Sequence, residues 1–245
     1  LLIGIHAVRA ALKHGADRIV SLQYDAERRD RRLRELLSAA QRAGLKPVAV
    51  DRSSLDHISE GGNHQGVVAE ATVPAALDEA ALKALVAESD APPLILALDG
   101  VTDPHNLGAC LRSADGAGVT AVIAPRDRSC GLTPVVCRVA SGAAETVPFI
   151  QVTNLVRSLR WLQDESRCFV VGLAGEAEQS LHGADLRGPM VLVMGSEGEG
   201  LRRLTREACD QLLHLPMAGQ VESLNVSVAT GICLYEAVRQ RARSG

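Results

Sequence analysis

Apolar and polar positions alternate in short runs along the first 72 residues, and each run has the period of a helix or of a strand. Six runs follow one another: HAVRAALKHG, RIVSLQYD, RDRRLRELLSAAQRAG, LKPVAVD, SSLDHIS and QGVVAEATV. The first, third and fifth have helical spacing, and the others are strand-like. This order predicts a small α/β domain over residues 1–72.

A proline-bounded segment separates this region from the rest of the chain. Residues 73–93 include Pro74 at one end and a pair of prolines at the other, with Leu82 and Leu85 at helical spacing between them. Because prolines interrupt regular structure at both ends, the segment is predicted to be a linker that carries one short helix.

From Leu94 onward the pattern changes to strand-like runs that are apolar throughout. These runs are LILAL, TAVIAP, CFVVGLAG, MVLVMG and QLLHLPM, and helical stretches separate them. Residues 94–245 are therefore predicted to form an α/β domain with a mostly parallel sheet covered on both faces. Ligands bind such sheets beyond the carboxyl ends of the strands, so the segments after the strands are expected to carry function.

Composition narrows the class of protein further. The 245 residues are 47% apolar with a net charge of −3, which is typical of a globular protein. The six cysteines form no CxxC pair and no Cys/His ligand spacing, so neither a zinc site nor a disulfide framework is expected. No apolar run reaches the roughly 18 residues of a membrane helix, and the opening LLIGIHAVRAALKHG is too interrupted for a signal peptide. We therefore expect a cytoplasmic protein with reduced thiols, no metal and no membrane segment.

The first unusual segment follows the run LILAL. Asp103 and Pro104 are a typical N-cap and first helical residue, so a helix is expected from about Pro104 to Ala114. The spacing of Leu107, Leu111 and Ala114 predicts that these three residues form its buried stripe.

Two polar residues of that helix are candidates for function. Asn106 lies in the first turn, where its amide can bond a ligand or merely a neighbouring loop. Arg112 shares a face with His105, two turns earlier. An ion pair with Asp115 is the competing interpretation of Arg112. A lone histidine is more often structural, so His105 is not counted among the catalytic candidates.

The second segment, MGSEGEGL at residues 194–201, looks like a glycine-rich phosphate loop. However, Glu197 and Glu199 stand where an anion would sit, and no P-loop lysine is present. A neutral or cationic ligand fits better, although Glu197 as a solvated carboxylate is the simpler alternative. A serine-hydrolase elbow at Ser196 is disfavoured because Met194 stands where that motif needs glycine.

The third segment, residues 215–241, contains a turn and then a long helix. Either Ser223 or Asn225 is expected to cap this helix. Small residues cluster near its start, at Ser227, Ala229, Thr230 and Gly231. Because small side chains allow close approach, a packed contact is expected there rather than free solvent.

Together the three segments resemble the signature motifs of the SpoU family of RNA 2′-O-ribose methyltransferases, within the SPOUT class. The Asn, Gly and Arg of motif one match Asn106, Gly108 and Arg112. Motif two, Gly-x-Glu-Gly-x-Gly, matches the loop that begins at Gly195, and motif three, Ser-Leu-Asn-Val-Ser-Val, begins at Ser223. The resemblance extends to the front of the chain, through GIHAV and HQGVVA.

This resemblance implies a fold, a reaction and a set of partners. The implied cofactor is S-adenosylmethionine, whose cationic sulfonium is compatible with an acidic glycine loop, and the implied substrate is a guanosine ribose in 23S ribosomal RNA. Residues 1–72 would be an RNA-binding domain like ribosomal protein L30. The C-terminal domain would contain a trefoil knot and form a homodimer.

The resemblance also implies roles for individual residues. The implied catalytic residues are Arg112, Asn106, Glu197 and Asn225, and the implied cofactor-binding residues are Gly195, Leu215, Leu224 and Ser223. A guanidinium is effectively always charged, so we expect Arg112 to act as an electrostatic clamp rather than as a base. Which protomer supplies Arg112 to a given site is left open by the sequence.

An arginine-rich run, RRDRRLR at residues 28–34, is the candidate RNA contact of the front domain. A solvated helix face balanced by Asp30 and Glu35 is the alternative. With the resemblance to the family, contact with phosphates is favoured. Aromatic residues make up only 2% of the chain, so base stacking is not expected to be the main source of affinity for RNA.

Two other functions remain open from the sequence, besides the serine hydrolase already disfavoured at Ser196. One is a SpoU enzyme that acts on transfer RNA or on another ribosomal RNA site. Another is a non-catalytic RNA-binding protein of ribosome assembly, which the intact motif residues disfavour. The substrate itself is either free 23S RNA or a ribosome assembly intermediate.

Overall fold

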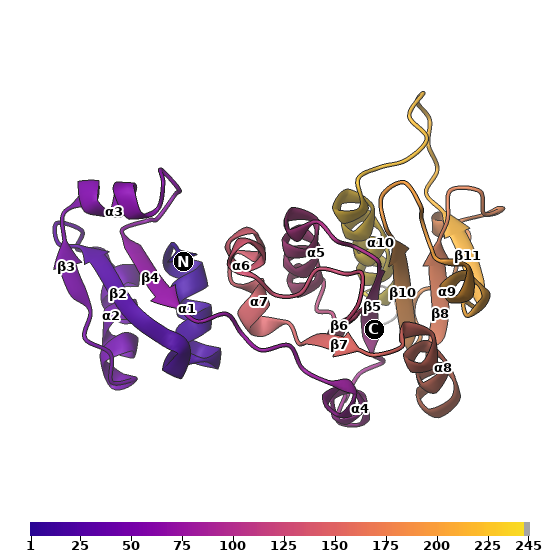
Figure 1. Ribbon diagram of the computed structural model, residues 1–245, viewed down its shortest axis with the longest axis horizontal. Coiled ribbons are helices and arrows are strands. Elements are labelled where there is room, and N and C mark those ends of the chain that lie inside the picture. Colours follow the sequence, from indigo (N-terminus) through magenta and orange to yellow (C-terminus); the bar gives the residue numbers. More distant parts are fainter. Residues whose placement is uncertain (243–245) are drawn as a thin grey trace. The chain divides into compact units, whose positions relative to one another are not determined.

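The computed structural model describes residues 1–242, and their contacts divide the chain into two compact units. The first unit contains Leu1–Ala75 and Leu132–Thr146. The second contains Ala76–Gly131 and the chain from Val147 onward. Figure 1 shows the elements of both units. Within the described residues, no helix is long and apolar enough to span a membrane.

A four-stranded sheet with the order β1-β4-β2-β3 organises the first unit. Strand β4 is antiparallel to both β1 and β2, whereas β2 is parallel to β3. The elements before the second unit are β1 (Leu2–Ile3), α1 (Ile5–His14), η1 (Ala16–Arg18), β2 (Ile19–Asp25), α2 (Arg31–Arg42), β3 (Val48–Val50), α3 (Arg52–Ile58) and β4 (Val67–Ala71). The six runs predicted for this region all correspond to elements, and the two-residue β1 and the short 3₁₀ helix η1 were missed.

Helix α2 illustrates how the sequence sets the core of this unit. Asp30 caps its first turn by accepting a hydrogen bond from the Leu33 amide at 3.1 Å. Leu33 and Leu36 are fully buried, while Leu37 packs at the edge of the same core. Arg31, Arg32 and Arg34 project outward, because residues one or two apart on a helix point in different directions.

A segment from the middle of the chain completes the first unit. It contains α6 (Pro134–Ala140) and α7 (Ala143–Thr146), and α7 packs on α1. Arg18 pairs with the buried Glu145. Gly142 has φ +100° and lies where a Cβ would be 3.2 Å from the Ala7 Cα, so this close approach of two backbones requires glycine.

A seven-stranded sheet with the order β7-β6-β5-β10-β8-β11-β9 organises the second unit. Every neighbouring pair is parallel, as the apolar runs predicted. The short strands β7 and β9 were not predicted. The elements are α4 (Glu79–Ala87), β5 (Leu94–Asp99), α5 (Pro104–Gly116), β6 (Ala121–Pro125), β7 (Phe149–Val152), α8 (Leu155–Ser166), β8 (Phe169–Leu173), β9 (Gln179–Ser180), η2 (Leu181–Gly183), β10 (Met190–Gly195), α9 (Arg203–Glu207), β11 (Gln211–His214) and α10 (Val226–Arg241).

Helices cover both faces of this sheet (Figure 1). On one face, Leu82 of α4 and Leu159 of α8 join a buried cluster with Ile95 of β5 and Val191 of β10. On the other face, α5 and α10 pack against each other, and α10 also contacts β10. Because β5 and β10 are paired at the centre, the loops at their carboxyl ends are supported on both sides.

The two helices α5 and α10 begin as the sequence suggested. The Asp103 side chain accepts hydrogen bonds from the amides of His105 and Asn106, each at 3.2 Å, and the predicted stripe of α5 is buried. Asn225, rather than Ser223, caps α10. This outcome settles the alternative that the sequence left open.

The small residues of α10 make a packed contact, as expected. Thr230 is completely buried, and the Cys110 thiol of α5 donates to its hydroxyl oxygen at 3.6 Å. A Cβ at Gly231 would lie 3.6 Å from the Ser113 hydroxyl. The two helices therefore run side by side in the same direction.

Candidate active site

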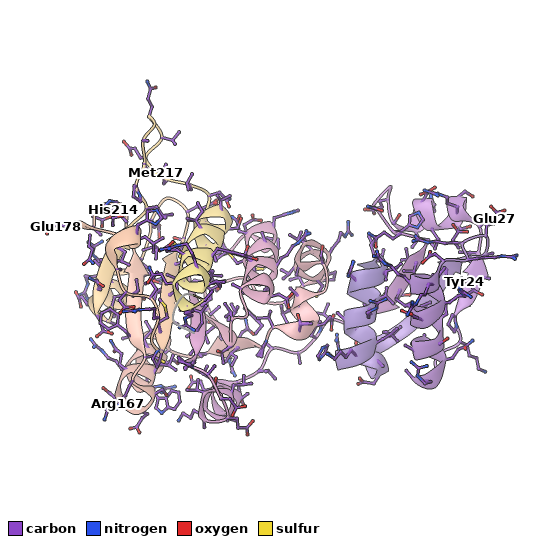
Figure 2. All side chains as sticks on the ribbon, turned by 180° about the vertical axis from the view of Figure 1, so that it is seen from behind. Tyr24, Glu27, Arg167, Glu178, His214 and Met217 are labelled. Atoms are coloured by element: carbon purple, nitrogen blue, oxygen red, sulfur yellow. The ribbon has the colours of Figure 1, made fainter. Side chains whose placement is uncertain are left out.

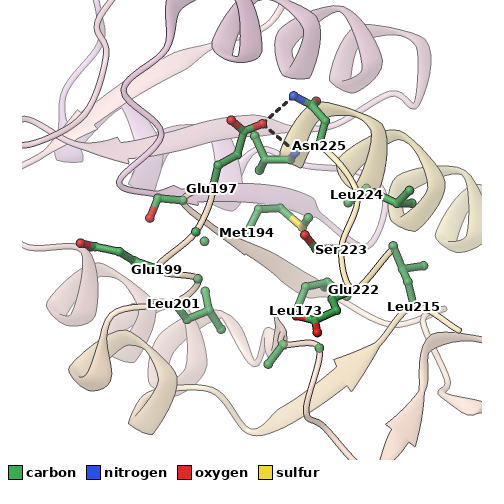
Figure 3. A pocket seen from close by; sticks show the side chains of 18 of the residues that line it. Leu173, Met194, Glu197, Glu199, Leu201, Leu215, Glu222, Ser223, Leu224 and Asn225 are labelled. Atoms are coloured by element: carbon green, nitrogen blue, oxygen red, sulfur yellow. Dashed lines mark hydrogen bonds between the residues drawn. The ribbon is translucent and has the colours of Figure 1, made fainter. Parts of the chain in front are cut away.

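A pocket of about 640 Å³ lies at the carboxyl edge of the second sheet. Its walls come from the segments after β8, β10 and β11 and from the start of α10 (Figure 3). Figure 2 shows Met217, one of the lining residues, in the loop that leaves β11 just beyond His214. The pocket thus occupies the position where parallel sheets bind ligands, and its volume is within the usual range of about 300–1,000 Å³.

The loop after β10 closes on itself and forms one side of the pocket. The Ser196 amide donates to the Gly200 carbonyl at 3.1 Å, and the Gly200 amide donates back at 3.0 Å. Gly198 and Gly200 have φ +84° and +68°. A Cβ at Gly195 would lie 2.1 Å from the carbonyl carbon of Gly200, so no other residue fits there. The glycines therefore close a tight loop, and Glu197 projects from it.

Asn106, Glu197 and Asn225 meet beside this loop, and we call them the amide–carboxylate cluster. The Asn106 amide donates to Glu197 Oε1 at 3.1 Å, and the Asn225 amide donates to the same oxygen at 2.5 Å. The Asn225 amide also donates to Asn106 Oδ1 at 2.9 Å. Figure 3 shows Glu197 and Asn225 facing each other at one end of the pocket. One residue from each of the three sequence segments is thus held in a single hydrogen-bonded group.

The orientation of the Asn225 amide is fixed by its second task as the N-cap of α10. Its Oδ1 accepts from the Ser227 amide at 2.9 Å and from the Ser227 hydroxyl at 2.6 Å. The amide nitrogen is consequently left to face Glu197. Helix capping and assembly of the cluster depend on the same side chain.

A buried carboxylate anchors the far end of the glycine loop. Asp99, the last residue of β5, is 1% exposed and pairs in register with Gly195. Its Oδ2 accepts from the Arg202 amide at 2.9 Å, and the Arg202 guanidinium is 3.5 Å from its Oδ1. Because this carboxylate holds Arg202 just beyond the loop, both ends of the loop are fixed to the central strands.

Arg112 does not join the amide–carboxylate cluster. It is exposed on α5, and within residues 1–242 it forms no ion pair with Asp115 and no hydrogen bond with Glu197. It lies one turn before Gly116, where a Cβ would be 2.8 Å from the Tyr235 hydroxyl of α10. The structure therefore brings together three of the four residues predicted as catalytic. The fourth, Arg112, lies apart from them on the exposed surface of α5.

The four residues predicted to bind the cofactor all line the pocket: Gly195, Leu215, Ser223 and Leu224. Sequence reasoning missed several other lining residues, among them Leu173, Glu176, Arg206 and Met217. Leu173 ends β8 and Glu176 lies just after it, so the rule that ligands bind beyond strand ends applied to this segment although no motif marked it.

The cysteines take no part in this site. All six carry free thiols, and burial raises the pKa of Cys110 to about 11 and that of Cys233 to about 12. Such thiols are poor nucleophiles at neutral pH. No group of three or more metal-ligating side chains occurs in the part of the chain that the structure describes.

Comparison with known proteins gives a consistent result. The model of the SpoU rRNA Methylase family matches residues 93–235, and a model described as RNA 2′-O ribose methyltransferase substrate binding matches residues 1–75. Two curated relatives bear the name 23S rRNA (guanosine-2′-O-)-methyltransferase RlmB. The protein from Ralstonia nicotianae is 58% identical, covering 99% of this chain and 96% of its own. The protein from Shewanella oneidensis is 54% identical, covering 98% and 97%.

A solved structure supports the same assignment. The SpoU methyltransferase AviRb from Streptomyces viridochromogenes, in complex with the cofactor AdoMet, is 26% identical with a TM-score of 0.75. The alignment covers 100% of this chain and 90% of that one. With matching models over both regions, relatives of nearly equal length and all three motifs at strand ends, this chain belongs to the SpoU rRNA methylase family.

Proposed function

We propose that the protein transfers a methyl group from S-adenosylmethionine (AdoMet) to the 2′-hydroxyl of a guanosine ribose in 23S ribosomal RNA. The observation that carries this proposal is the amide–carboxylate cluster, which three separated segments build at the edge of the pocket. Relatives that bear the name of this activity cover almost the whole chain.

The pocket has the size and the chemistry that the cofactor requires. Its apolar residues include Leu173, Met194, Leu215 and Leu224, which suit the burial of a purine. Its carboxylates suit a cation and would repel a phosphate. When bound, AdoMet supplies an electrophilic methyl group on its sulfonium. We propose that Gly195, Leu215, Ser223 and Leu224 contact the cofactor.

Glu197 is proposed to orient the ribose. Its Oε1 is engaged by the amides of Asn106 and Asn225, so the carboxylate plane is fixed. Within residues 1–242, its Oε2 has no hydrogen bond, which leaves that oxygen free to accept one from the substrate hydroxyl. Alignment of the hydroxyl with the methyl group is the main source of rate in such a displacement.

Arg112 is proposed to act as an electrostatic clamp. A guanidinium remains charged throughout the physiological range, so it stabilises a developing alkoxide or holds the neighbouring phosphate rather than removing a proton. Its exposed position on α5 leaves it accessible to a polynucleotide.

We further propose that the protein is a homodimer that buries the outer face of α10. Val228, Ile232 and Tyr235 are 52%, 39% and 53% exposed and lie at helical spacing along one side of this helix. Large apolar side chains gathered on one exposed stripe are typical of an interface. Arg112 lies one turn before Gly116, which approaches Tyr235 of this stripe, and it does not bond to Glu197 of its own protomer. We therefore propose that it works in the site of the partner protomer.

Residues 1–72 are proposed to be an L30-like RNA-binding domain, with 73–93 as a linker and 94–245 as the methyltransferase domain. In this domain the outer side of α2 presents Arg31, Arg34 and Arg42 along a shallow groove. Arginines one to three turns apart suit successive phosphates of an RNA strand. The cytoplasm, where ribosomal RNA is available, is the proposed location.

The test is transfer of labelled methyl from AdoMet to protein-free 23S ribosomal RNA, with 16S ribosomal RNA and transfer RNA in parallel. We expect one guanosine of 23S RNA to gain a 2′-O-methyl group. Methylation of transfer RNA instead would replace the proposed substrate. Transfer only to ribosome assembly intermediates would change the substrate but keep the reaction, whereas a failure to bind AdoMet would remove the reaction as well.

A further inference from the structure

The charged residues that line the pocket are unequally distributed by sign. Glu176, Glu197, Glu199 and Glu222 supply carboxylates, and Arg206 supplies the one positive charge among the lining residues in the described chain. AdoMet is not simply a cation, because its methionine end carries a carboxylate beside its ammonium group. In an acidic pocket, that carboxylate is repelled everywhere except near Arg206.

Arg206 already has a partner that matches the other half of an amino acid. It lies on α9, and its guanidinium hydrogen-bonds to Glu176 in the segment after β8. Both side chains remain accessible, at 38% and 65% exposure. An arginine beside a glutamate presents one group for a carboxylate and one for an ammonium, so the pair is complementary to a zwitterion.

The pair also stands apart from the amide–carboxylate cluster. In Figure 3, Glu197 and Asn225 lie at one end of the pocket and Leu173 lies at the other. Glu176 follows Leu173 by three residues and holds Arg206. Glu197 is committed to two amides, whereas Arg206 and Glu176 are bonded only to each other among the described side chains.

We propose that Arg206 and Glu176 bind the amino-acid end of AdoMet, with the guanidinium on the α-carboxylate and the Glu176 carboxylate on the α-ammonium. This assignment rests on the proposed function and adds to it the residues that read the methionine end of the cofactor. The pair is therefore a determinant of ligand choice. An adenosyl ligand that lacks only the carboxylate gains nothing from Arg206, and one that lacks the whole amino acid gains nothing from either residue.

Equilibrium binding by calorimetry with the full-length protein tests this assignment. The ligands are AdoMet, decarboxylated AdoMet, which lacks only the carboxylate, and 5′-methylthioadenosine, which lacks the amino acid. The variants are Arg206→Gln and Glu176→Gln. The matched control is Arg203→Gln, because Arg203 lies on the same helix but pairs with Glu207 outside the pocket.

We expect Arg206→Gln to weaken AdoMet about 10-fold, as for one charge-assisted contact in a partly exposed site, and to leave decarboxylated AdoMet nearly unchanged. Glu176→Gln should weaken both of these ligands, since both keep the ammonium, and should leave 5′-methylthioadenosine unchanged. Arg203→Gln should bind all three like the wild type.

Two results would overturn the assignment while leaving the proposed function intact. One is undiminished AdoMet binding by Arg206→Gln. The other is an equal loss for all three ligands, which would mean that the ion pair only supports the pocket wall. A wild-type protein that binds no AdoMet would overturn the proposed function and this inference together.

Discussion

The two regions of the molecule that we propose carry its functional charge are built in opposite ways. On α2 of the first unit, arginines stand on a solvent-exposed helix face, where Arg31 pairs with Glu35 one turn away. At the pocket of the second unit, Asn106, Glu197 and Asn225 come from three distant segments and are held by mutual hydrogen bonds. The charges on α2 act separately, so replacing one arginine removes only that residue's contribution to binding. In the amide–carboxylate cluster, replacing one side chain also removes a hydrogen-bond partner of the other two.

The largest effect is expected from Arg112, the charged residue that belongs to neither arrangement. Replacing Arg112 by alanine should lower the rate of methyl transfer about 10³-fold, since a preorganised charge near the reacting oxygen is lost. The affinity for AdoMet should not change, because Arg112 does not line the pocket. Single-turnover kinetics together with calorimetry separate these two quantities, and near-normal turnover would contradict the clamp.

A mixture of two inactive variants shows which protomer supplies Arg112. Arg112→Ala and Glu197→Gln proteins are unfolded together, refolded and assayed. If Arg112 works in the partner's site, each mixed dimer regains one intact site, and random pairing restores about a quarter of wild-type activity. No recovery would place Arg112 in its own protomer's site.

Glu197 tests the precision of the amide–carboxylate cluster. Glu197→Gln keeps the shape of the side chain and the acceptor for the two amides, but it places an NH₂ group at the position of Oε2, which we propose accepts from the ribose hydroxyl. We expect kcat to fall about 10²-fold with little change in the KM for RNA. A larger effect on KM than on kcat would instead indicate a role in RNA binding.

The arginines of α2 should respond in the opposite manner. Replacing Arg31, Arg34 and Arg42 by glutamine should weaken RNA binding about 10-fold and lower the slope of log affinity against log salt by about 2–3, with kcat unchanged at saturating RNA. A matched control removes three ion-paired arginines elsewhere, Arg157, Arg187 and Arg203. Equal losses in both proteins would mean that overall charge, not α2, attracts the RNA.

The difference between the two regions also decides how much the sequence could predict. Periodicity found the strands of both sheets, except β1, β7 and β9, because a continuous apolar run is a local property. The short strand β9 has only two residues and therefore no pattern to recognise. A trefoil knot belongs to the fold expected for this family, but no rule of ordinary connectivity predicts one.

The site was predictable only in part for a related reason. The motifs identified Asn106, Glu197 and Asn225, yet nothing in their spacing shows that two amides donate to one carboxylate oxygen. The Arg206 and Glu176 pair has no motif, since it joins segments that only the fold brings together. The hydrogen bond from the Arg202 amide to Asp99 could not be predicted for the same reason, because the two residues are 103 positions apart and no motif links them.

The smallest expected effect separates the two tasks of Asn225. Asn225→Ala and Asp78→Ala each remove the N-cap of a helix in the second unit, α10 and α4 respectively. Each should cost about 1 kcal/mol of stability, or roughly 2–4 °C in the midpoint of thermal unfolding. Only Asn225→Ala should also reduce methyl transfer, because it alone takes a donor away from Glu197. If Asp78→Ala lost as much activity at equal stability, the cluster would be no more than a consequence of how α10 begins, and the contrast between the two charged regions would lose its basis.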